Sequence, residues 1–181
     1  MNEGSIIRTE RLLLRPLCRD DLEHIQRYAV RPDYYRYLPI PEQTPESVAA
    51  FLEARLAEDA VAEKKTWLFA IEPYEVGHII GIIRLTIVNT YLRTADTGYA
   101  MDSDFYGRGY MTEAVKAVLG FGFRELQLHR IWATADVDNT PSCRLLERIG
   151  MRREGLLKQD KLMRGQWRDS YLYAILESEF Q

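Results

Sequence analysis

The stretch Tyr106-Gly107-Arg108-Gly109-Tyr110-Met111-Thr112 decides the expected fold, because it joins a strand pattern, Thr94 to Asp102, to a helix pattern, Tyr110 to Leu126. Two glycines allow the backbone to curl tightly, so that several N–H groups point outward at the first helical turn. With the helix dipole, such a turn can bind a phosphate or pyrophosphate, although a glycine pair also serves an ordinary tight turn. The stretch lacks the Gly-Lys-Ser/Thr of a Walker loop and the last glycine of G-x-G-x-x-G, so it fits a triphosphatase or a dinucleotide site poorly.

On either side of this stretch, the pattern indicates a mixed sheet. Upstream, three runs rich in apolar residues predict an antiparallel meander: Trp67 to Ile71, Ile79 to Val88 and Thr94 to Asp102. Downstream, a strand from Arg130 to Val137 and a short helix from Pro141 to Ile149 precede two strands around Gly165 and Gln166. This strand–helix order predicts parallel pairing with crossover connections in the second half of the chain.

The N-terminal part adds one strand and two helices. We expect a strand from Ile6 to Arg15, a helix capped by Asp20 or Asp21, and a second helix that begins at Thr44-Pro45. The fold class is therefore α/β (α+β), with a mixed central sheet of about seven strands and about four helices on both faces. No linker or repeat interrupts the pattern, so we expect residues 1–181 to form a single domain.

Composition excludes several classes of protein. The 24 basic and 27 acidic side chains give a net charge of −3, which argues against bulk binding of nucleic acid. Hydrophobic residues make up 46% of the chain, enough for a core, so we do not expect disorder. The most apolar stretch, His78 to Val88, contains Arg84 and is shorter than a membrane span, and the first residues lack a signal-peptide pattern. Only two cysteines occur. We therefore expect a soluble cytoplasmic protein without membrane association.

A second candidate segment, Asp136 to Ser142, also leads from a strand into a helix. One interpretation is helix capping by Asn139 or Thr140, with Pro141 at the first helical position. The other is that Asn139 and Ser142 face a ligand that lies between this helix and the glycine-containing stretch. The segment by itself favours capping.

Other chemistries find no support in the residue pattern. The sequence lacks the G-x-S-x-G motif of serine hydrolases. His24, His78 and His129 show no metal-ligand spacing with one another or with cysteine, so we expect no metal. Cys143 lies on an apolar helix face and is expected to be a buried structural thiol.

Several motifs occur together in a fixed order and carry a family resemblance. They are Thr9 to Leu17, Gly98-Tyr99, Gly107 to Ala114, Leu128 to Ile131, Asp138 to Ser142, Leu146 to Met151 and Trp167-Arg168-Asp169. Each is common, but the set spans nearly the whole chain. The chain resembles the GCN5-related N-acetyltransferase (GNAT) superfamily and, within it, the RimJ/RimL-like ribosomal-protein alanine N-acetyltransferase branch.

This resemblance implies transfer of an acetyl group from acetyl-CoA, bound as a co-substrate, to an amine. It implies a sheet splayed between its fourth strand, Thr94 to Asp102, and its fifth, Arg130 to Val137, with the pantetheine arm in the gap. Asn139 matches the position that hydrogen-bonds the pantetheine region, and Ser142 the position nearest the thioester sulfur. The expected main-chain contacts to pantetheine come from Ala100, Met101 and Asp102, and those to pyrophosphate from Gly107, Arg108, Gly109, Tyr110, Met111 and Thr112.

The expected mechanism is direct transfer, because no activated nucleophile is visible in the sequence. The amine must lose a proton before attack, and Asp96 is the candidate general base; a solvated carboxylate and a water-mediated proton path are the alternatives. Many relatives carry a tyrosine acid where this chain has Leu146. The resemblance therefore places Ser142 at the departing thiolate, where its hydroxyl would solvate the sulfur.

The acceptor is the least determined part of the prediction. We expect its pocket between the loop Tyr34 to Gln43 and the hairpin Lys158 to Tyr173. The resemblance favours the N-terminal amine of a ribosomal or other protein; a small amine such as a polyamine, amino acid or antibiotic is the alternative. The net negative charge is compatible with a cationic amine. A CoA-binding module without turnover, and a homodimer, also remain open.

Overall fold

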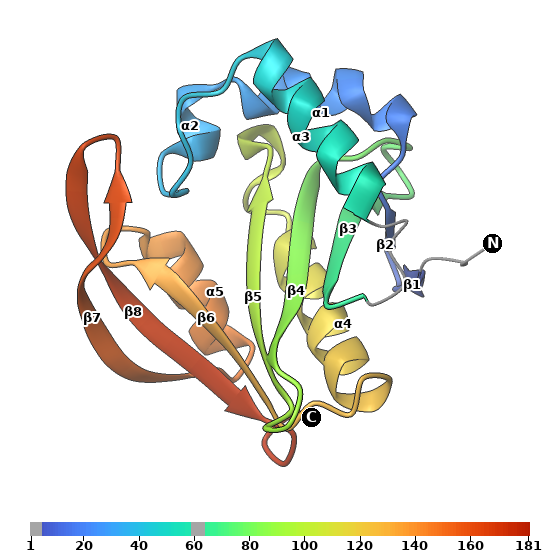
Figure 1. Cartoon of the computed structure of the whole chain (residues 1–181). Helices are drawn as coiled ribbons and strands as arrows, with labels where there is room; N and C mark the ends of the chain where they lie inside the picture. The colour runs from blue at the N-terminus through green and yellow to red at the C-terminus, as the bar shows by residue number, and fades with distance from the viewer. Residues whose placement is uncertain (1–4, 59–63) are drawn as a thin grey trace.

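The computed structural model of the chain describes residues 5–58 and 64–181 and contains one mixed sheet of eight strands (Figure 1). The spatial order is β1-β2-β3-β4-β5-β6-β8-β7. The strands are β1 (Ile7–Arg8), β2 (Leu12–Pro16), β3 (Thr66–Pro73), β4 (Gly81–Asn89), β5 (Thr94–Met101), β6 (Arg130–Asp136), β7 (Arg152–Met163) and β8 (Gln166–Leu176).

Helices cover both faces of this sheet, as predicted. The α-helices of the described residues are α1 (Leu22–Ala29), α2 (Pro32–Tyr35), α3 (Pro45–Glu58), α4 (Tyr110–Arg124) and α5 (Thr140–Arg148), with short 3-10 turns η1 (Arg19–Asp21) and η2 (Ser103–Phe105). Phe69 and Ile71 of β3 pack in the core with α4 and α5, whereas Ala70 between them packs with α1 and α3. Within the described residues, no helix has the length and apolar content that crossing a membrane requires.

The fold class is confirmed, and two details of the prediction are wrong. The expected strand Ile6 to Arg15 is two strands, because Thr9 turns the chain: its N–H donates to the carbonyl of Leu12 at 3.0 Å, and its Oγ1 accepts from the N–H of Leu12 at 2.9 Å. The short helix α2, with Pro32 in its first turn, is the helix that the sequence pattern missed.

Parallel pairing in the second half of the sheet was also over-predicted. The pair β5–β6 is parallel, but β6–β8 and β7–β8 are antiparallel. The reason is that β7 and β8 form a hairpin through Arg164 and Gly165, and the returning strand β8 inserts between β6 and β7.

The parallel pair β5–β6 opens after a short contact. Pairing runs from Thr94 opposite Arg130 to Asp96 opposite Trp132, and beyond this point the two strands diverge (Figure 1). On its other side, β5 stays paired with β4 as far as Met101. This opening is the splay predicted between the fourth and fifth strands of the sequence pattern. It exposes one main-chain edge of residues 97–101 toward the gap.

Close packing of α4 on the sheet depends on a glycine inside the helix. A Cβ atom built on Gly122 would lie 2.7 Å from Cδ1 of Ile131 on β6, so a larger residue would push the helix away. Val118 and Leu119, one turn earlier, are completely buried. The glycine costs about 1 kcal/mol in helix propensity and allows the C-terminal part of α4 to pack closely on the sheet.

A buried ion pair ties the start of α1 to β2. Asp21 accepts from Arg15 at 2.7 and 2.9 Å and from the N–H of Cys18 at 2.8 Å, and it is 2% exposed. Burial raises the pKa of the Asp21 carboxyl, but the hydrogen bonds from Arg15 and Cys18 outweigh burial and hold the pKa below its usual value.

We expect Asp21→Asn to lower the free energy of unfolding by roughly 2–3 kcal/mol at neutral pH, because it breaks a buried ion pair. The lowered pKa means that this stabilisation is present above about pH 4 and is lost as pH falls through the folded-state pKa. Urea unfolding at pH 7 and pH 3 measures both effects. Asp20→Asn, an exposed neighbour, is the matched control. If Asp21→Asn and wild type differ in the free energy of unfolding by the same amount at both pH values, the role assigned to the Asp21–Arg15 ion pair is contradicted.

Candidate functional site

The glycine-containing stretch forms an open cradle of N–H groups at the start of α4. Gly107 and Gly109 have φ values of 77° and 82°, a left-handed conformation that favours glycine, and Gly109 is the N-cap of α4. The N–H groups of residues 107–112 donate no hydrogen bond to any residue in the described part of the chain. These unpaired donors and the helix dipole suit a phosphate group.

Arg11 and Glu113 hold the cradle in place. Arg11 donates to Oε2 of Glu113 at 2.7 Å and to the carbonyl of Arg108 at 3.0 Å. Thr9 also donates to Glu113, at 2.6 Å. Burial raises the pKa of the Glu113 carboxyl, but the hydrogen bonds from Thr9 and Arg11 outweigh burial and hold the pKa below its usual value. The N-terminal motif Thr9 to Leu17 therefore fixes the glycine-containing loop, a role that the sequence did not reveal.

A hollow of about 450 Å³ lies beside the cradle. Lys116 on α4 and Arg148 on α5 are among the cations that line it, so the hollow can accept a further anionic group. Its lining residues are Thr9, Glu10, Arg11, Gly109, Thr112, Glu113, Lys116 and Arg148.

Asn139 caps α5, as the simpler interpretation of its segment predicted. Its Oδ1 accepts from the N–H of Ser142 at 3.3 Å, and a proline stands in the first helical turn. Its Nδ2 has no hydrogen-bond partner among residues 5–58 and 64–181. Capping therefore uses one side of the amide and leaves a donor for a ligand on the other.

Arg168 fixes the loop in front of α5. It donates to both carboxylate oxygens of Asp136, each at 2.9 Å, and it also pairs with Asp138. Asp136 is 4% exposed; burial raises the pKa of its carboxyl, and Arg168 lowers it below the usual value. The Trp167-Arg168-Asp169 motif thus orients the segment that carries Asn139.

Ser142 has a partner that sequence reasoning missed. The hydroxyl of Tyr99 on β5 lies 2.9 Å from Oγ of Ser142. Burial raises the pKa of Tyr99 to about 12, so its phenol stays protonated at neutral pH. Leu146, where many relatives carry tyrosine, is 1% exposed in the core. Strand alternation places Tyr99 with Ala95 and Met101 on the face toward α4 and α5. This alternation is the sequence signal that could have placed Tyr99 near Ser142.

Asp96 lies on the opposite face of β5 and forms an ion pair with Arg84. Both carboxylate oxygens accept from this guanidinium, one of them at 3.1 Å, and Arg84 also donates to Thr86. The structure therefore does not bring Asp96 together with Ser142 and Tyr99, because the side chains of Asp96 and Tyr99 lie on opposite faces of β5. The predicted main-chain contacts, Ala100, Met101 and Asp102, lie along and just beyond the exposed edge of β5.

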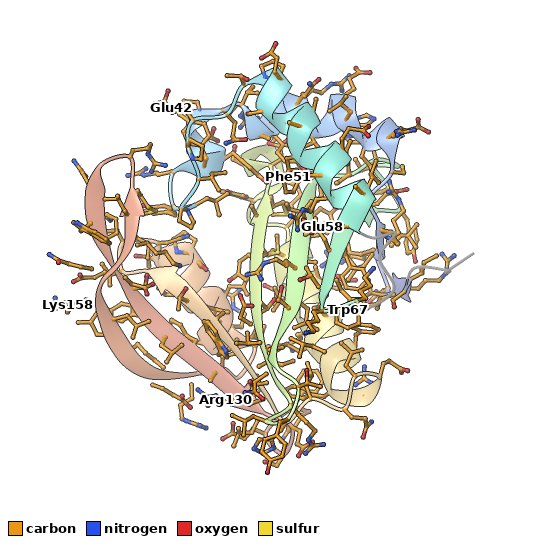
Figure 2. All side chains as sticks on the ribbon, viewed as in Figure 1. Glu42, Phe51, Glu58, Trp67, Arg130 and Lys158 are labelled. Atoms are coloured by element: carbon orange, nitrogen blue, oxygen red, sulfur yellow. The ribbon has the colours of Figure 1, made fainter. Side chains whose placement is uncertain are left out.

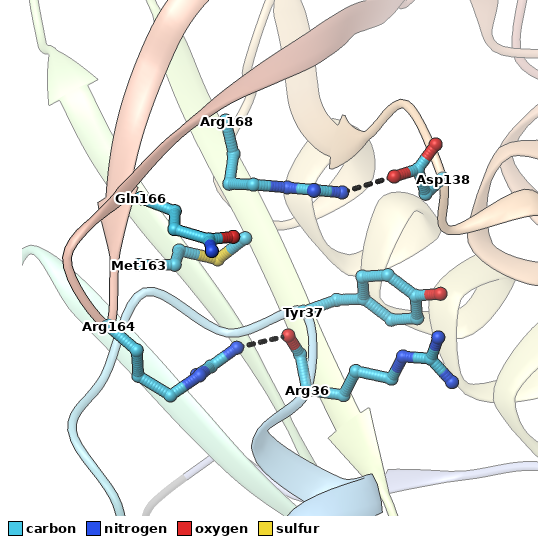
Figure 3. Close-up of a pocket in the computed structure, with 7 residues that line it drawn as sticks. All are labelled: Arg36, Tyr37, Asp138, Met163, Arg164, Gln166 and Arg168. Atoms are coloured by element: carbon cyan, nitrogen blue, oxygen red, sulfur yellow. Dashed lines mark hydrogen bonds and ion pairs between the residues drawn. The ribbon is translucent and has the colours of Figure 1, made fainter.

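A cavity of about 350 Å³ lies between the loop after α2 and the β7–β8 hairpin, the two segments expected to form the acceptor pocket (Figure 3). Figure 2 labels Glu42 on that loop and Lys158 on the hairpin. Among the aromatic residues of these two segments, Tyr37 lines the cavity, Tyr35 is buried, and Trp167 is 59% exposed. The lining residues are Arg36, Tyr37, Asp138, Met163, Arg164, Gln166 and Arg168.

The remaining candidates are structural. Cys143 is a free, buried thiol whose pKa is raised by burial, which does not favour a nucleophile. The imidazole of His129 is half exposed and pairs with Glu177 at 3.1 Å, away from the cradle. Across residues 5–58 and 64–181, no group of three or more His, Cys, Asp and Glu side chains is placed to hold a metal ion.

Comparison with known proteins agrees with the family resemblance that the sequence motifs carry. The family model "Acetyltransferase (GNAT) domain" matches residues 11–152. The "uncharacterized N-acetyltransferase YnaD" of Bacillus subtilis (strain 168) is 34% identical, over 96% of this chain and 98% of that protein. A crystal structure described as Mycobacterium smegmatis RimJ in complex with CoA-disulfide is 29% identical, with a TM-score of 0.84 over 97% of this chain and 87% of that one.

Two further relatives have named acceptors, and the acceptors differ. The spermidine N(1)-acetyltransferase of Escherichia coli (strain K12) is 24% identical over 92% of this chain and 87% of that protein. The [ribosomal protein uS5]-alanine N-acetyltransferase of the same organism is 35% identical over 54% of this chain and 50% of that protein.

The bond between Tyr99 and Ser142 can be measured by a double-mutant cycle on unfolding. Tyr99→Phe and Ser142→Ala should show a coupling free energy of about 1 kcal/mol, the net value of one partly buried hydrogen bond. Tyr110→Phe is the matched control, because the Tyr110 hydroxyl donates to Glu75 instead. Its coupling with Ser142→Ala should be near zero. Equal coupling in the two cycles would show that the contact is absent in solution.

Proposed function

Because the chain belongs to the GNAT family of N-acetyltransferases, we propose that it moves the acetyl group of acetyl-CoA directly to a primary amine. The observation that carries this proposal is the arrangement of two helix N-termini, α4 and α5, on either side of the opening between β5 and β6. One offers unpaired N–H groups to a pyrophosphate, and the other places a hydroxyl beside the gap.

The donor is held, in this proposal, by main-chain groups. The cradle of residues Gly107, Arg108, Gly109, Tyr110, Met111 and Thr112 takes the pyrophosphate, and Lys116 and Arg148 attract the remaining phosphate charge. The exposed edge near Ala100, Met101 and Asp102 pairs with the pantetheine arm as an added strand would, and Asn139 donates its free Nδ2 to the arm. The relative crystallised with CoA-disulfide supports this assignment.

Ser142 acts at the sulfur, with Tyr99 as its positioning residue. When the amine nitrogen bonds to the acetyl carbon and the carbon–sulfur bond breaks, the thiolate needs a hydrogen-bond donor. Either hydroxyl can donate in the hydrogen bond between Tyr99 and Ser142. In this proposal Tyr99 is the donor, and the hydrogen of Ser142 is then free to point at the sulfur. A phenol with a pKa of about 12 is a weaker acid than an ordinary thiol, about 8.5, so the pair solvates the thiolate rather than protonating it.

Asp96 receives the proton of the amine through a water molecule. Direct contact would require its ion pair with Arg84 to open, because both carboxylate oxygens accept from this guanidinium. A water on the free side of the carboxylate needs no such rearrangement. The face of β5 that carries Asp96 is the one that faces α1 and α3, the side on which the acceptor cavity begins.

The acceptor is a primary amine, either a protein N-terminus or a small molecule. The two named relatives support both kinds, since one carries spermidine and the other a ribosomal protein in its name. Both names describe transfer of an acetyl group to an amine but differ in the acceptor, and so the two relatives support the reaction more strongly than any one acceptor.

Release of free thiol from acetyl-CoA, measured over a panel of amines and N-terminal peptides with mass detection of the products, tests this proposal. We expect acetylation of at least one acceptor. Ser142→Ala should lower kcat by about 10-fold to 100-fold with a small change in KM, because it removes a donor to the developing thiolate. CoA binding without turnover on any acceptor would instead favour a binding module.

The role of Asp96 predicts a change in the pH profile. Asp96→Asn should depress the rate at neutral pH and restore part of it at higher pH, where more of the amine is already deprotonated. Thr86→Val, which removes another partner of Arg84, is the control for disturbance of the ion pair alone. A wild-type pH–rate profile for Asp96→Asn would remove this residue from the mechanism.

A further inference from the structure

The acceptor cavity is positively charged, although the chain as a whole is acidic. Three arginines, Arg36, Arg164 and Arg168, line it together with a single carboxylate, Asp138 (Figure 3). Arg36 and Arg164 border one side, and Arg168 and Asp138 border the opposite side. Glu42, further along the loop after α2, is not among the lining residues. The local charge is therefore the reverse of the net charge.

Arg168 is not available to a ligand. Its guanidinium donates to both oxygens of the buried Asp136 and pairs with Asp138 as well. This arrangement also neutralises the one carboxylate that lines the cavity. A ligand that enters the cavity consequently encounters Arg36 and Arg164 as the cations whose charge is not balanced there.

Arg164 is fixed but not neutralised. It donates to the carbonyls of Tyr35 at 3.1 Å and Arg36 at 2.5 Å, and its guanidinium lies 5.7 Å from the centre of the Tyr35 ring. Carbonyls orient a guanidinium without cancelling its charge. Among residues 5–58 and 64–181, Arg164 has no carboxylate partner.

Like Arg164, Arg36 is exposed. Its guanidinium lies 5.2 Å from the centre of the Tyr37 ring, and in the described part of the chain it pairs with no carboxylate. Two guanidinium groups that border a concave surface raise the local concentration of anions and repel additional cations. A planar carboxylate matches their geometry.

The cavity borders the loop that precedes α5. Asp138, which lines it, is followed directly by Asn139, and the N–H of Ser142 caps onto Asn139. An acceptor whose anionic end rests on Arg36 and Arg164 therefore lies beside the loop that leads into α5.

We propose that the acceptor of this enzyme is an amine that also carries a carboxylate, bound by Arg36 and Arg164, and that polycationic amines are poor acceptors. This inference rests on the proposed function, because it names the acceptor class of the same site. The carboxylate belongs either to a free amino acid or to an acidic residue near a peptide N-terminus, and the two sources share this chemistry.

Matched acceptor pairs test the inference. Lysine against cadaverine, and ornithine against putrescine, differ by one carboxylate; a peptide that begins Ser-Asp-Asp against one that begins Ser-Lys-Lys tests the second source. For one of the two sources, free amino acids or peptides, we expect kcat/KM to be at least 10-fold higher for the carboxylate-bearing member of each pair. Equal rates, or faster acetylation of cadaverine, putrescine and the basic peptide, would overturn the inference and leave the acetyltransferase activity intact. Thiol release with no amine at all would overturn both.

Charge reversal at the cavity locates the effect. Arg36→Glu should lower kcat/KM for the preferred acceptor at least 10-fold, narrow or reverse the preference within each pair, and leave KM for acetyl-CoA unchanged. Arg8→Glu, the same change in charge on β1 at the opposite edge of the sheet, should leave the preference at the wild-type value. Arg36→Gln, which keeps a polar side chain, should show an acceptor preference between those of Arg36→Glu and Arg8→Glu. An unchanged preference in Arg36→Glu would contradict the assignment.

Discussion

The short parallel pairing of β5 with β6 is the constraint on which the rest of this structure depends. Two strands that share a sheet normally satisfy each other's main-chain groups, and here that pairing ends after Asp96 and Trp132. The exposed edge of β5 can be satisfied by water or by a ligand that behaves as a strand. Each strand leads into a helix whose N-terminus lies beside the opening, α4 after β5 and α5 after β6. In the proposed function, donor binding and chemistry therefore both depend on one interruption in a hydrogen-bond ladder.

Arginine–carboxylate pairs from distant parts of the chain keep this interruption in place. Arg11 joins the N-terminal strands to Glu113 and the glycine-containing loop, and Arg168 joins β8 to the loop before α5. Arg31, which follows α1, pairs with Asp102 at 3.0 Å and with Asp104 in the turn before the cradle. Bidentate guanidinium pairs suit this task because they fix orientation as well as distance. The opening is rigidly framed by side chains that never touch the reacting atoms.

Local signals made the fold and the conformation of the glycine-containing loop predictable from the sequence, whereas the partners of the candidate catalytic residues were not predictable. Gly107, Gly109 and the Asn139 cap act within a few residues of their own positions, and the structure shows the conformations they predicted. Tyr99 and Ser142 are 43 residues apart in the sequence. Arg84 and Asp96 lie on the neighbouring strands β4 and β5. Such pairs depend on strand register and on the angle at which α5 packs, which no local pattern specifies. The division of the first strand at Thr9 was missed because a single side chain causes the turn.

The β7–β8 hairpin ends the sheet, with β7 as its outermost strand, and this position has an evolutionary consequence. Substitutions near Met163, Arg164 and Gln166 alter one wall of the acceptor cavity, yet they disturb neither the pairing of β4 with β5 nor the cradle on α4. Under the proposed function, selection can therefore change the acceptor and keep the donor. Relatives named for a polyamine and for a ribosomal protein are the outcome to be expected when one half of an active site lies on the edge of a fold and the other half at its centre.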